Sequence, residues 1–507
     1  MENINRDFEF AQKDAKITDL KFDTKPIGYF KDAWIRFRKS RAAIAGAIVI
    51  ILIVLYAIIM PLVSSHGVDT TDGVYQYKRP FDANLASIGL VKGTYTKHCN
   101  DRAYLHLQMI GAAYEDYNGE SINAEKAINS EFNPIRGESE PYLVNGVRYR
   151  DCEVQDYYES GFRYYQITVD DYEALRSYEA KTGLRLLYPM VDTTLVESAM
   201  NTNDANYWYL TKSGYPVDQN GNAIREAKDL GKAQDIYLRD ADGNVQFYQI
   251  VASNSVKVRI FYWNYYFYKT GHIPSFLMGS DDQGRDIAVR LASGIGLSLI
   301  LAVSTFAINF VLGAIYGSIE GYFGGWADLI MERITDILVD IPFIILASIV
   351  KLRFIDTNQM SPMMALIFAF VVTGWIGPAY RVRTQFYRFK NQEYVLAART
   401  LGAGNARIMY KHIFPNTLGT IITASVLTIP GTIFSESMLS YLNIVSLNSG
   451  DITSLGTLLS TGQQYMVSFP HMILPPAIVI SLLMISFNLF GNGLRDAFNP
   501  SLRGAEE

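Results

Sequence analysis

The sequence predicts an all-α polytopic membrane protein with six transmembrane helices and a large α+β domain inserted on the outer side of the membrane. Two observations lead to this prediction. The 507 residues have a mean hydropathy of only +0.07, yet their apolar residues gather in long runs at 42–63 and from about 294 onward. Between these runs, roughly 65–275 is polar and rich in tyrosine. The chain is therefore suited to two solvents, lipid and water.

Residues 1–41 are expected to form a cytoplasmic tail that ends in an interfacial helix. In Tyr29–Arg41, three aromatic residues (Phe30, Trp34 and Phe37) share one helical face, and basic residues surround it. This pattern is typical of an amphipathic helix on an anionic membrane surface. A calmodulin-like target is the alternative.

Ala42–Val63 is predicted to be the first transmembrane helix. At about 1.5 Å per residue it is long enough to cross about 30 Å of hydrocarbon. Basic residues precede it, which places its N-terminal side in the cytoplasm. The run is too long, and starts too far into the chain, for a typical cleaved signal peptide, so we expect it to be retained.

Residues 64–276 are then expected to be an extracytoplasmic α+β domain. Capping residues predict a helix over Thr168–Gly183. A turn that contains glycine predicts a β-hairpin of Ile236–Arg239 with Val245–Val251, and Val256–Tyr262 is a further strand candidate. The many tyrosines suit either contact with a ligand or partner or an ordinary, partly buried core.

The only two cysteines, Cys99 and Cys152, both fall in this inserted domain. An extracytoplasmic compartment permits a disulfide between them, and this is our expectation. Two unpaired buried thiols are the alternative.

Residues 277–493 are predicted to hold the other five transmembrane helices, near 296–319, 330–350, 362–380, 417–437 and 472–490. With the inserted domain outside, the loop after the fourth helix is cytoplasmic. This loop carries a single acid, Glu393, and seven basic residues: Arg381, Arg383, Arg388, Lys390, Arg399, Arg407 and Lys411. That excess agrees with the positive-inside rule. A second cytoplasmic tail, 494–507, completes the chain.

Charged and small residues inside the predicted membrane helices are candidates for function. Charges at such depth are costly unless they are paired or face water. Arg333 and Asp336 can form an ion pair, so a structural pair and a role in gating are alternatives. Glycines recur every fourth residue in 313–321, which permits close helix packing within one subunit or between subunits. The candidates for gating are Arg333, Asp336, Asp340 and Glu436.

A polar segment, Asn391–Asn416, lies within the cytoplasmic loop 384–416. Apolar residues at helical spacing form one face of a short helix there: Tyr394, Ala397, Ala398 and Leu401. Gly402 and Gly404 then end this helix, and Asn405 can cap a second one.

This segment resembles the EAA loop of bacterial ABC-importer permeases, a type I permease fold. The order Glu-Tyr-Val-x-Ala-Ala-Arg, Leu-Gly-Ala and His-Ile-x-Pro-Asn is similar to the oligopeptide/dipeptide branch, and closest to its second ("C") permease. GSDDQGRD at 279–286 and GYFGGWADLIMERITD at 321–336 extend the resemblance, which covers about 29–63 and 270–502. Leu396 departs from the family, whose motif has Glu there. The long inserted domain is a second departure.

The resemblance implies a permease subunit that moves oligopeptides into the cytoplasm by alternating access. It implies these partners: a second related permease in a heterodimer, two cytoplasmic ABC ATPase subunits and an extracytoplasmic peptide-binding lipoprotein. ATP and Mg would be bound by the ATPase subunits, and this chain would bind no cofactor. The expected location is the bacterial plasma membrane, with both termini in the cytoplasm. The residues expected to contact an ATPase subunit are Glu393, Tyr394, Ala397, Ala398, Arg399, Leu401, Gly402 and Arg407.

The sequence argues against several other functions. It has no G-x-x-x-x-G-K-[ST] loop, no H-E-x-x-H zinc site and no G-x-S-x-G elbow, so we do not expect an enzyme. Asp240-x-Asp242-x-Asn244 lacks the glutamate of a calcium loop, and no metal site is expected. A net charge of −5 without a basic groove does not suit nucleic acid. The alternatives are a permease for dipeptides or a nickel chelate and, in another class, a membrane sensor or scaffold with an outward ligand-binding domain.

Overall fold

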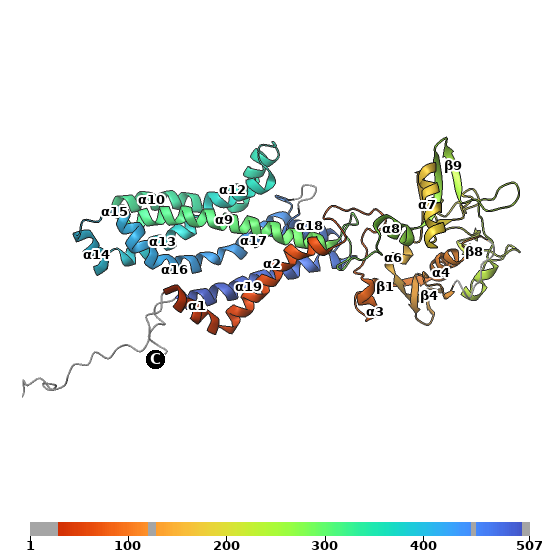
Figure 1. The fold of residues 1–507 in the computed structure, drawn as a ribbon, viewed down its shortest axis with the longest axis horizontal. Coiled ribbons are helices and arrows are strands. Elements are labelled where there is room, and N and C mark those ends of the chain that lie inside the picture. The colour runs from red at the N-terminus through yellow and green to blue at the C-terminus, as the bar shows by residue number, and fades with distance from the viewer. Residues whose placement is uncertain (1–28, 120–127, 448–452, 499–507) are drawn as a thin grey trace, which may run out of the picture.

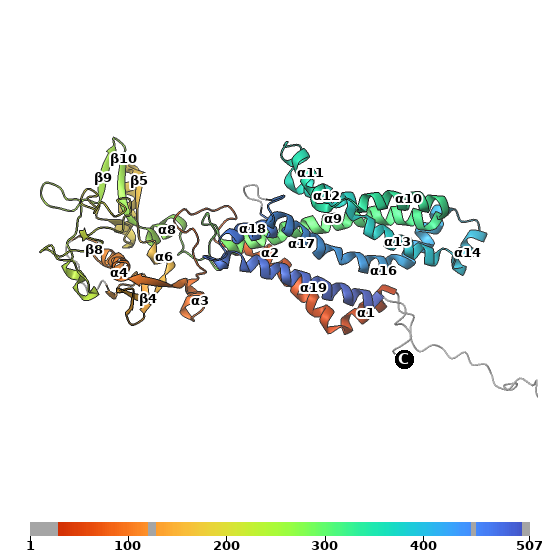
Figure 2. The same cartoon turned by 180° about the vertical axis from the view of Figure 1, so that it is seen from behind.

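The computed structural model describes residues 29–119, 128–447 and 453–498. Long helices form one part of the molecule, and an α+β region lies at one end of it (Figure 1). The view from behind shows the same division (Figure 2). Of the two predicted tails, residues 1–28 and 499–507 lie outside the described residues.

The helical part contains two helices before the α+β region and the remainder after it. These are α1 (Tyr29–Lys39), α2 (Arg41–Val63), α9 (Ile287–Phe323), α10 (Gly325–Val339), α11 (Phe343–Val350), α12 (Pro362–Gly374), α13 (Ile376–Phe389), α14 (Glu393–Thr400), α15 (Asn405–Arg407), α16 (Phe414–Val426), α17 (Thr428–Tyr441), α18 (Leu455–Gln464) and α19 (Leu474–Phe498). Within the described residues, five helical stretches are long and apolar enough to cross a membrane: Arg41–Val63, Ile287–Phe323, Pro362–Phe389, Asn405–Tyr441 and Pro470–Phe498.

The predicted third transmembrane helix, 330–350, is divided into two helices in the structure. α10 ends at Val339 and α11 begins at Phe343. Between them, Pro342 has no backbone N–H and disfavours helical backbone at the residue before it. With 15 and 8 residues, neither helix alone is long enough to cross a membrane.

Glycines on α9 let α13 pack against it at very short range. A Cβ atom at Gly317 would lie 2.1 Å from the carbonyl oxygen of Ala379. One at Gly313 would lie 2.6 Å from the Cβ atom of Pro378. The sequence left open whether this glycine stripe packs within one subunit or between subunits. In the structure, α13 of the same chain covers this stripe. Small residues allow two helices to approach this closely.

The amphipathic helix α1 lies against the end of this bundle. Ala33 and Phe37 are buried, and the ring of Phe37 meets Phe490 of α19 edge-on at a centroid distance of 5.5 Å. Trp34 stacks on Phe37 but is 59% exposed. The predicted aromatic face is therefore shared between the protein interior and the surroundings.

Every strand pair among the described residues of the α+β region is antiparallel. One sheet has the order β1-β4-β2, with β3 also paired to β4; a second has the order β5-β10-β6, with β9 also paired to β10; a third is β7-β8. The strands are β1 (Thr94–Asn100), β2 (Ile135–Glu138), β3 (Tyr142–Val144), β4 (Val147–Gln155), β5 (Phe162–Thr168), β6 (Leu187–Tyr188), β7 (Thr211–Lys212), β8 (Tyr215–Pro216), β9 (Tyr248–Ala252) and β10 (Ser255–Phe261). The helices are α3 (Ala83–Ser87), α4 (Asp101–Glu115), α6 (Asp156–Glu159), α7 (Val169–Thr182) and α8 (Tyr262–Thr270).

Aromatic residues form much of the core of this region. Trp208 is fully buried, and its indole N–H donates to the carbonyl oxygen of Met109 on α4 at 2.9 Å. Several tyrosines are buried in the same cluster: Tyr75, Tyr104, Tyr157, Tyr188, Tyr209, Tyr237, Tyr262 and Tyr266. For these residues the ordinary explanation, core packing, is confirmed.

Local signals predicted one helix and one strand correctly here, and one hairpin in part. Thr168 caps α7 in a capping box, and Gly183 ends it with φ +74°, as expected. The strand predicted at 256–262 is β10. The hairpin predicted for 236–239 with 245–251 forms at its tip, where Arg239 and Val245 make an antiparallel bridge and the Gln246 N–H donates to the carbonyl oxygen of Leu238. From Tyr248 onward its second strand, β9, pairs with β10 instead.

Cys99 and Cys152 are buried on the neighbouring strands β1 and β4, each with a free thiol, and the disulfide between them stays a prediction. Cys99 lies opposite Arg150, and Cys152 lies opposite Lys97, which makes the two cysteines diagonal neighbours. A hydrogen bond between the thiols raises the pKa of Cys152 and lowers that of Cys99.

The α+β region is joined firmly to the start of α9. Buried His66 contacts the Asp286 carboxylate through Nδ1 at 3.0 Å and the Tyr266 hydroxyl through Nε2 at 2.6 Å. Phe81 and Phe276 pair as a β-bridge close to the two ends of the region. Its position relative to the helices is therefore set by buried polar contacts rather than by a loose linker.

Candidate functional site

The segment after α13 folds as a compact unit at the end of the helical part far from the α+β region (Figure 1). α14 turns only one large side chain inward, Val395, which is fully buried. Val395 packs in a cluster with Phe386 of α13 and Ile408 of the following turn. The position of α14 is thus fixed by apolar contacts to the membrane helices.

The opposite face of α14 is apolar and uncovered. Tyr394 is 39% exposed, Leu401 is 88% exposed, and Ala397 between them is also exposed. An isolated leucine on a surface is ordinary, but this one continues a face of small and apolar side chains. We call Tyr394, Ala397, Ala398 and Leu401 the docking face.

Gly402 ends α14 in a conformation that favours glycine. Its φ is +80°, in the left-handed region, and its N–H donates to the carbonyl oxygen of Arg399 at 3.0 Å. Apart from the glycine and its two chain neighbours, no atom of the described residues lies within 4 Å of the place where a Cβ would be. The backbone conformation, and not crowding by this chain, therefore accounts for glycine here.

The second half of the segment is anchored to α9. The Tyr322 hydroxyl donates to Oδ1 of Asn405 at 2.9 Å, and Met409 and Ile413 are buried. Asn405 is the first residue of α15, and Gly404 occupies the cap position, so the predicted cap at Asn405 is wrong. The Asn405 side chain serves as a tie to α9 instead.

Charged residues of the segment are exposed. Among the described residues, Glu393, Arg399 and Arg407 form no ion pair within the chain and are available to a partner. They surround the docking face on the same short segment.

An arginine that the sequence reading did not single out links three helices. Arg383 of α13 donates through Nε and Nη2 to both oxygens of Asp328 on α10, at 2.7 and 3.0 Å, and through Nη1 to Glu332 at 3.0 Å. Its Nε also lies 3.4 Å from Glu320 of α9. Asp328 and Glu332 are four residues apart, so their carboxylates lie on the same face of α10. This spacing is the sequence signal that a basic residue such as Arg383 binds there. A forked arginine–carboxylate contact of this kind fixes both distance and orientation.

A cavity of about 730 Å³ opens beside this arginine. The predicted gating residues Arg333, Asp336 and Asp340 of α10 line it, together with Glu320 and Arg383. The predicted Arg333–Asp336 pair exists at 2.9 Å, but both side chains are more than half exposed, so it contributes little to stability.

Glu436 lies apart from this cavity in a buried polar network. Its carboxylate accepts from the hydroxyls of Ser298 on α9, Ser440 on α17 and Ser454 before α18, at 3.2, 3.1 and 2.6 Å. The residue is fully buried. These bonds join α18 to the bundle, which favours a structural role for Glu436 over gating.

Two known families match the chain. One is described as the binding-protein-dependent transport system inner membrane component and matches residues 309–504. The other is described as the N-terminal TM domain of oligopeptide transport permease C and matches residues 28–80. Residues 81–308, which include the α+β region, lie outside both matches.

Individual relatives agree with these matches. The oligopeptide transport system permease protein OppC of Bacillus subtilis (strain 168) is 40% identical over 225 residues, which cover 44% of this chain and 72% of the relative. The dipeptide transport system permease protein DppC of the same organism is 40% identical over 236 residues, covering 44% of this chain and 68% of the relative. A solved chain of the MetNI methionine ABC transporter in an inward-facing conformation aligns at 18% identity with a TM-score of 0.33, covering 41% of this chain and 96% of that chain.

Proposed function

Since the chain belongs to the family of binding-protein-dependent transport permeases that includes OppC and DppC, we propose that it is the transmembrane subunit of an ATP-driven importer of oligopeptides. ATP is hydrolysed by separate subunits of such transporters. This chain would provide half of the path through the membrane and open it alternately to each side. The names of the relatives support a peptide substrate, and they divide between oligopeptides and dipeptides.

The docking face is the observation that carries this proposal. An importer subunit without a nucleotide site of its own needs a surface on which a motor subunit can act. Tyr394, Ala397, Ala398 and Leu401 offer an apolar face with little bulk, and burying Leu401 alone would contribute about 1.5–3 kcal/mol. Glu393, Arg399 and Arg407 can pair with charges around the groove that receives it.

The contacts behind the docking face explain how a pull on it would reach the membrane. Val395 ties α14 to α13, and Asn405 ties the segment to α9. α13 and α9 are in turn held by the glycine stripe, and Arg383 adds α10. Helices that are packed this closely move together as one body and do not deform separately.

We further propose six membrane crossings, with α10 and α11 together forming the third as a broken helix. Pro342 at the break is tolerated in a membrane when neighbouring groups satisfy the freed backbone. The N- and C-termini and the docking face would lie in the cytoplasm, and residues 64–276 outside it. The two views support this arrangement, since α14 and the α+β region lie at opposite ends of the molecule (Figures 1 and 2).

The partners follow from the same proposal. They are a second related permease, two cytoplasmic ATPase subunits and an extracytoplasmic peptide-binding lipoprotein in the plasma membrane of a bacterium. The inserted domain is proposed to meet the lipoprotein or to shield the outer mouth of the path. This chain would bind no cofactor, and its docking face would have no catalytic role.

Uptake measured in cells tests this function against its alternatives. Deleting the gene is expected to abolish uptake of a radiolabelled tetrapeptide, and a plasmid copy should restore it. Excess unlabelled tetrapeptide should compete, whereas competition only by dipeptide or only by a nickel–histidine chelate would move the substrate to those classes. Uptake that is unchanged by the deletion, with altered gene expression on adding peptide, would favour a sensor and contradict the importer.

A further inference from the structure

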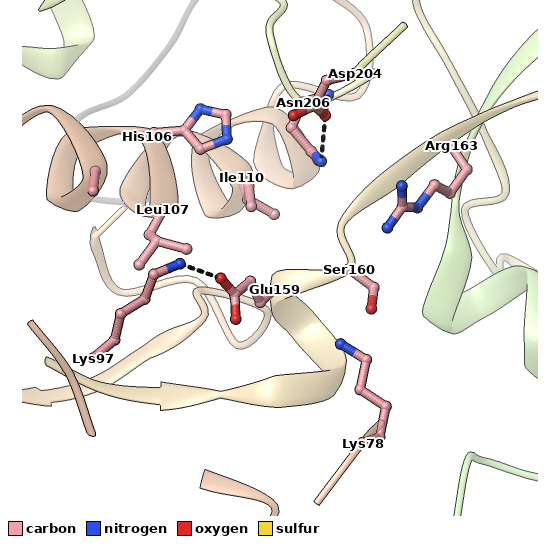
Figure 3. A pocket seen from close by; sticks show the side chains of 11 residues that line it. Lys78, Lys97, His106, Leu107, Ile110, Glu159, Ser160, Arg163, Asp204 and Asn206 are labelled. Atoms are coloured by element: carbon pink, nitrogen blue, oxygen red, sulfur yellow. Dashed lines mark hydrogen bonds and ion pairs between the residues drawn. The ribbon is translucent and has the colours of Figure 1, made fainter. Parts of the chain in front are cut away.

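The α+β region contains a pocket of about 370 Å³ that the permease function does not use (Figure 3). One wall is α4, with His106, Leu107 and Ile110. The other wall holds Glu159 and Ser160, at the end of α6. This volume is at the lower end of the range for small-molecule sites, about 300–1,000 Å³.

The pocket wall holds a polar group without a partner. The Ser160 side chain is only 3% exposed, and among the described residues its hydroxyl has no hydrogen-bond partner. Figure 3 shows this hydroxyl between the ammonium of Lys78 and the guanidinium of Arg163. A buried hydroxyl that makes no hydrogen bond costs about 1–3 kcal/mol of stability. A ligand that forms a hydrogen bond with Ser160 would remove this cost.

The charges around the pocket fall into two groups. Lys97 is paired with Glu159 at 2.5 Å, and Lys78 is paired with Asp156 at 3.0 Å. Arg163 and Asp204 also line the pocket, and neither forms an ion pair with another described residue. The Asp204 carboxylate is nevertheless held in place, because Oδ1 accepts from the backbone N–H and the side-chain amide of Asn206 at 3.0 and 2.9 Å.

His106 lines the pocket with a fixed, uncharged ring. Its Nδ1 lies 2.9 Å from the Tyr209 hydroxyl, and its ring stacks on Tyr207 at a centroid distance of 4.4 Å. Burial lowers the pKa of His106, so the ring is neutral at neutral pH. The pocket thus has one free cation, one free anion and an apolar wall of Leu107 and Ile110 among its described residues.

We propose that this pocket binds a small zwitterion, namely an amino acid or a short peptide, with its carboxylate at Arg163 and Ser160 and its ammonium at Asp204. The guanidinium fork of arginine matches a carboxylate in plane, and an aspartate accepts the three donors of an ammonium. A phosphate dianion fits less well, because the acids Glu159 and Asp204 share the pocket with the cations. The inference stands on the pocket alone and does not depend on transport.

Calorimetric titration of the full-length protein in lipid nanodiscs tests the proposal. Alanine or alanylalanine is expected to bind with saturation, and the one that binds identifies the source of the zwitterion. N-acetylation or C-terminal amidation of the bound probe should weaken binding at least tenfold. Arg163→Gln and Asp204→Asn should each do the same, whereas Lys212→Gln, an exposed change on β7, should bind as the parent does.

Ser160→Ala provides a second readout that does not depend on a charge. Without ligand this variant should unfold at the same or a higher temperature than the parent, because an unsatisfied buried hydroxyl has been removed. With ligand its thermal stabilisation should be smaller. Absence of saturable binding of either probe to the parent protein, tighter binding of inorganic phosphate, or equal affinity in Arg163→Gln and Asp204→Asn would overturn the proposal.

Discussion

Replacing Gly402 or Ala398 by aspartate is expected to abolish peptide uptake while the protein remains in the membrane. At Ala398 the new carboxylate would enter an apolar contact, and an unpaired charge there costs several kcal/mol, well over tenfold in affinity. At Gly402 it adds a side chain where φ is +80°, with about 1–2 kcal/mol of backbone strain. Uptake should fall at least tenfold in both variants.

The ATPase activity of the reconstituted complex separates this effect from misfolding. The motor subunits should still hydrolyse ATP, but peptide-loaded binding protein should no longer stimulate them. Leu195→Asp is a suitable control, because it adds the same charge at an exposed position of the α+β region, where a substitution usually changes stability by less than about 0.5 kcal/mol. Normal uptake by Gly402→Asp and Ala398→Asp would refute the coupling role of the docking face.

Gly317→Ala is expected to destabilise the helical part severely. In an ordinary helix this change is stabilising by about 1 kcal/mol, because alanine is the better helix former. Here the added methyl group would lie 2.1 Å from the carbonyl oxygen of Ala379, so α9 and α13 would have to separate. Overpacking against backbone costs about 1–3 kcal/mol or more, and we expect the midpoint of thermal unfolding in detergent to fall by about 5 °C or more.

Gly296→Ala on the same helix is the matched control. Outside the backbone of α9 itself and the neighbouring residues, no described atom lies within 4 Å of a Cβ at Gly296, so this variant should be as stable as the parent or slightly more stable. Equal unfolding temperatures for Gly317→Ala and Gly296→Ala would show that the α9–α13 contact is not as close as the structure has it. Movement of α14 would then not be passed on through these helices.

The sequence predicted most strongly those features that depend on local chemistry. Apolar runs located the long helices, and the cap residues Thr168 and Gly183 located α7. Hydropathy alone joins α10 and α11 into one apolar run, because it is blind to backbone geometry; Pro342, a residue that can kink a membrane helix, marks the break. Only the tip of the predicted hairpin forms, because β9 has a competing partner, β10, and pairing between strands is decided by packing over longer range.

The candidate site was predictable in part for the same reason. Helical spacing placed Tyr394, Ala397, Ala398 and Leu401 on one face, and the structure leaves this face exposed except at Ala398, which is half-buried. Arg383 was counted only as a cytoplasmic charge, since its partners Asp328 and Glu332 lie more than fifty residues away. The strand register that makes Cys99 and Cys152 diagonal neighbours likewise cannot be read from composition.

Photo-crosslinking from position 401 tests the central claim most directly, namely that the docking face receives the motor subunit. A crosslinking amino acid at Leu401, which is 88% exposed, should form an adduct with an ATPase subunit in membranes that contain the assembled transporter. The same amino acid at Val467, which lies in the chain ahead of α19 and is 93% exposed, should form no adduct with an ATPase subunit. An adduct with an ATPase from position 467, or none from position 401 in a complex active in uptake, would contradict the account.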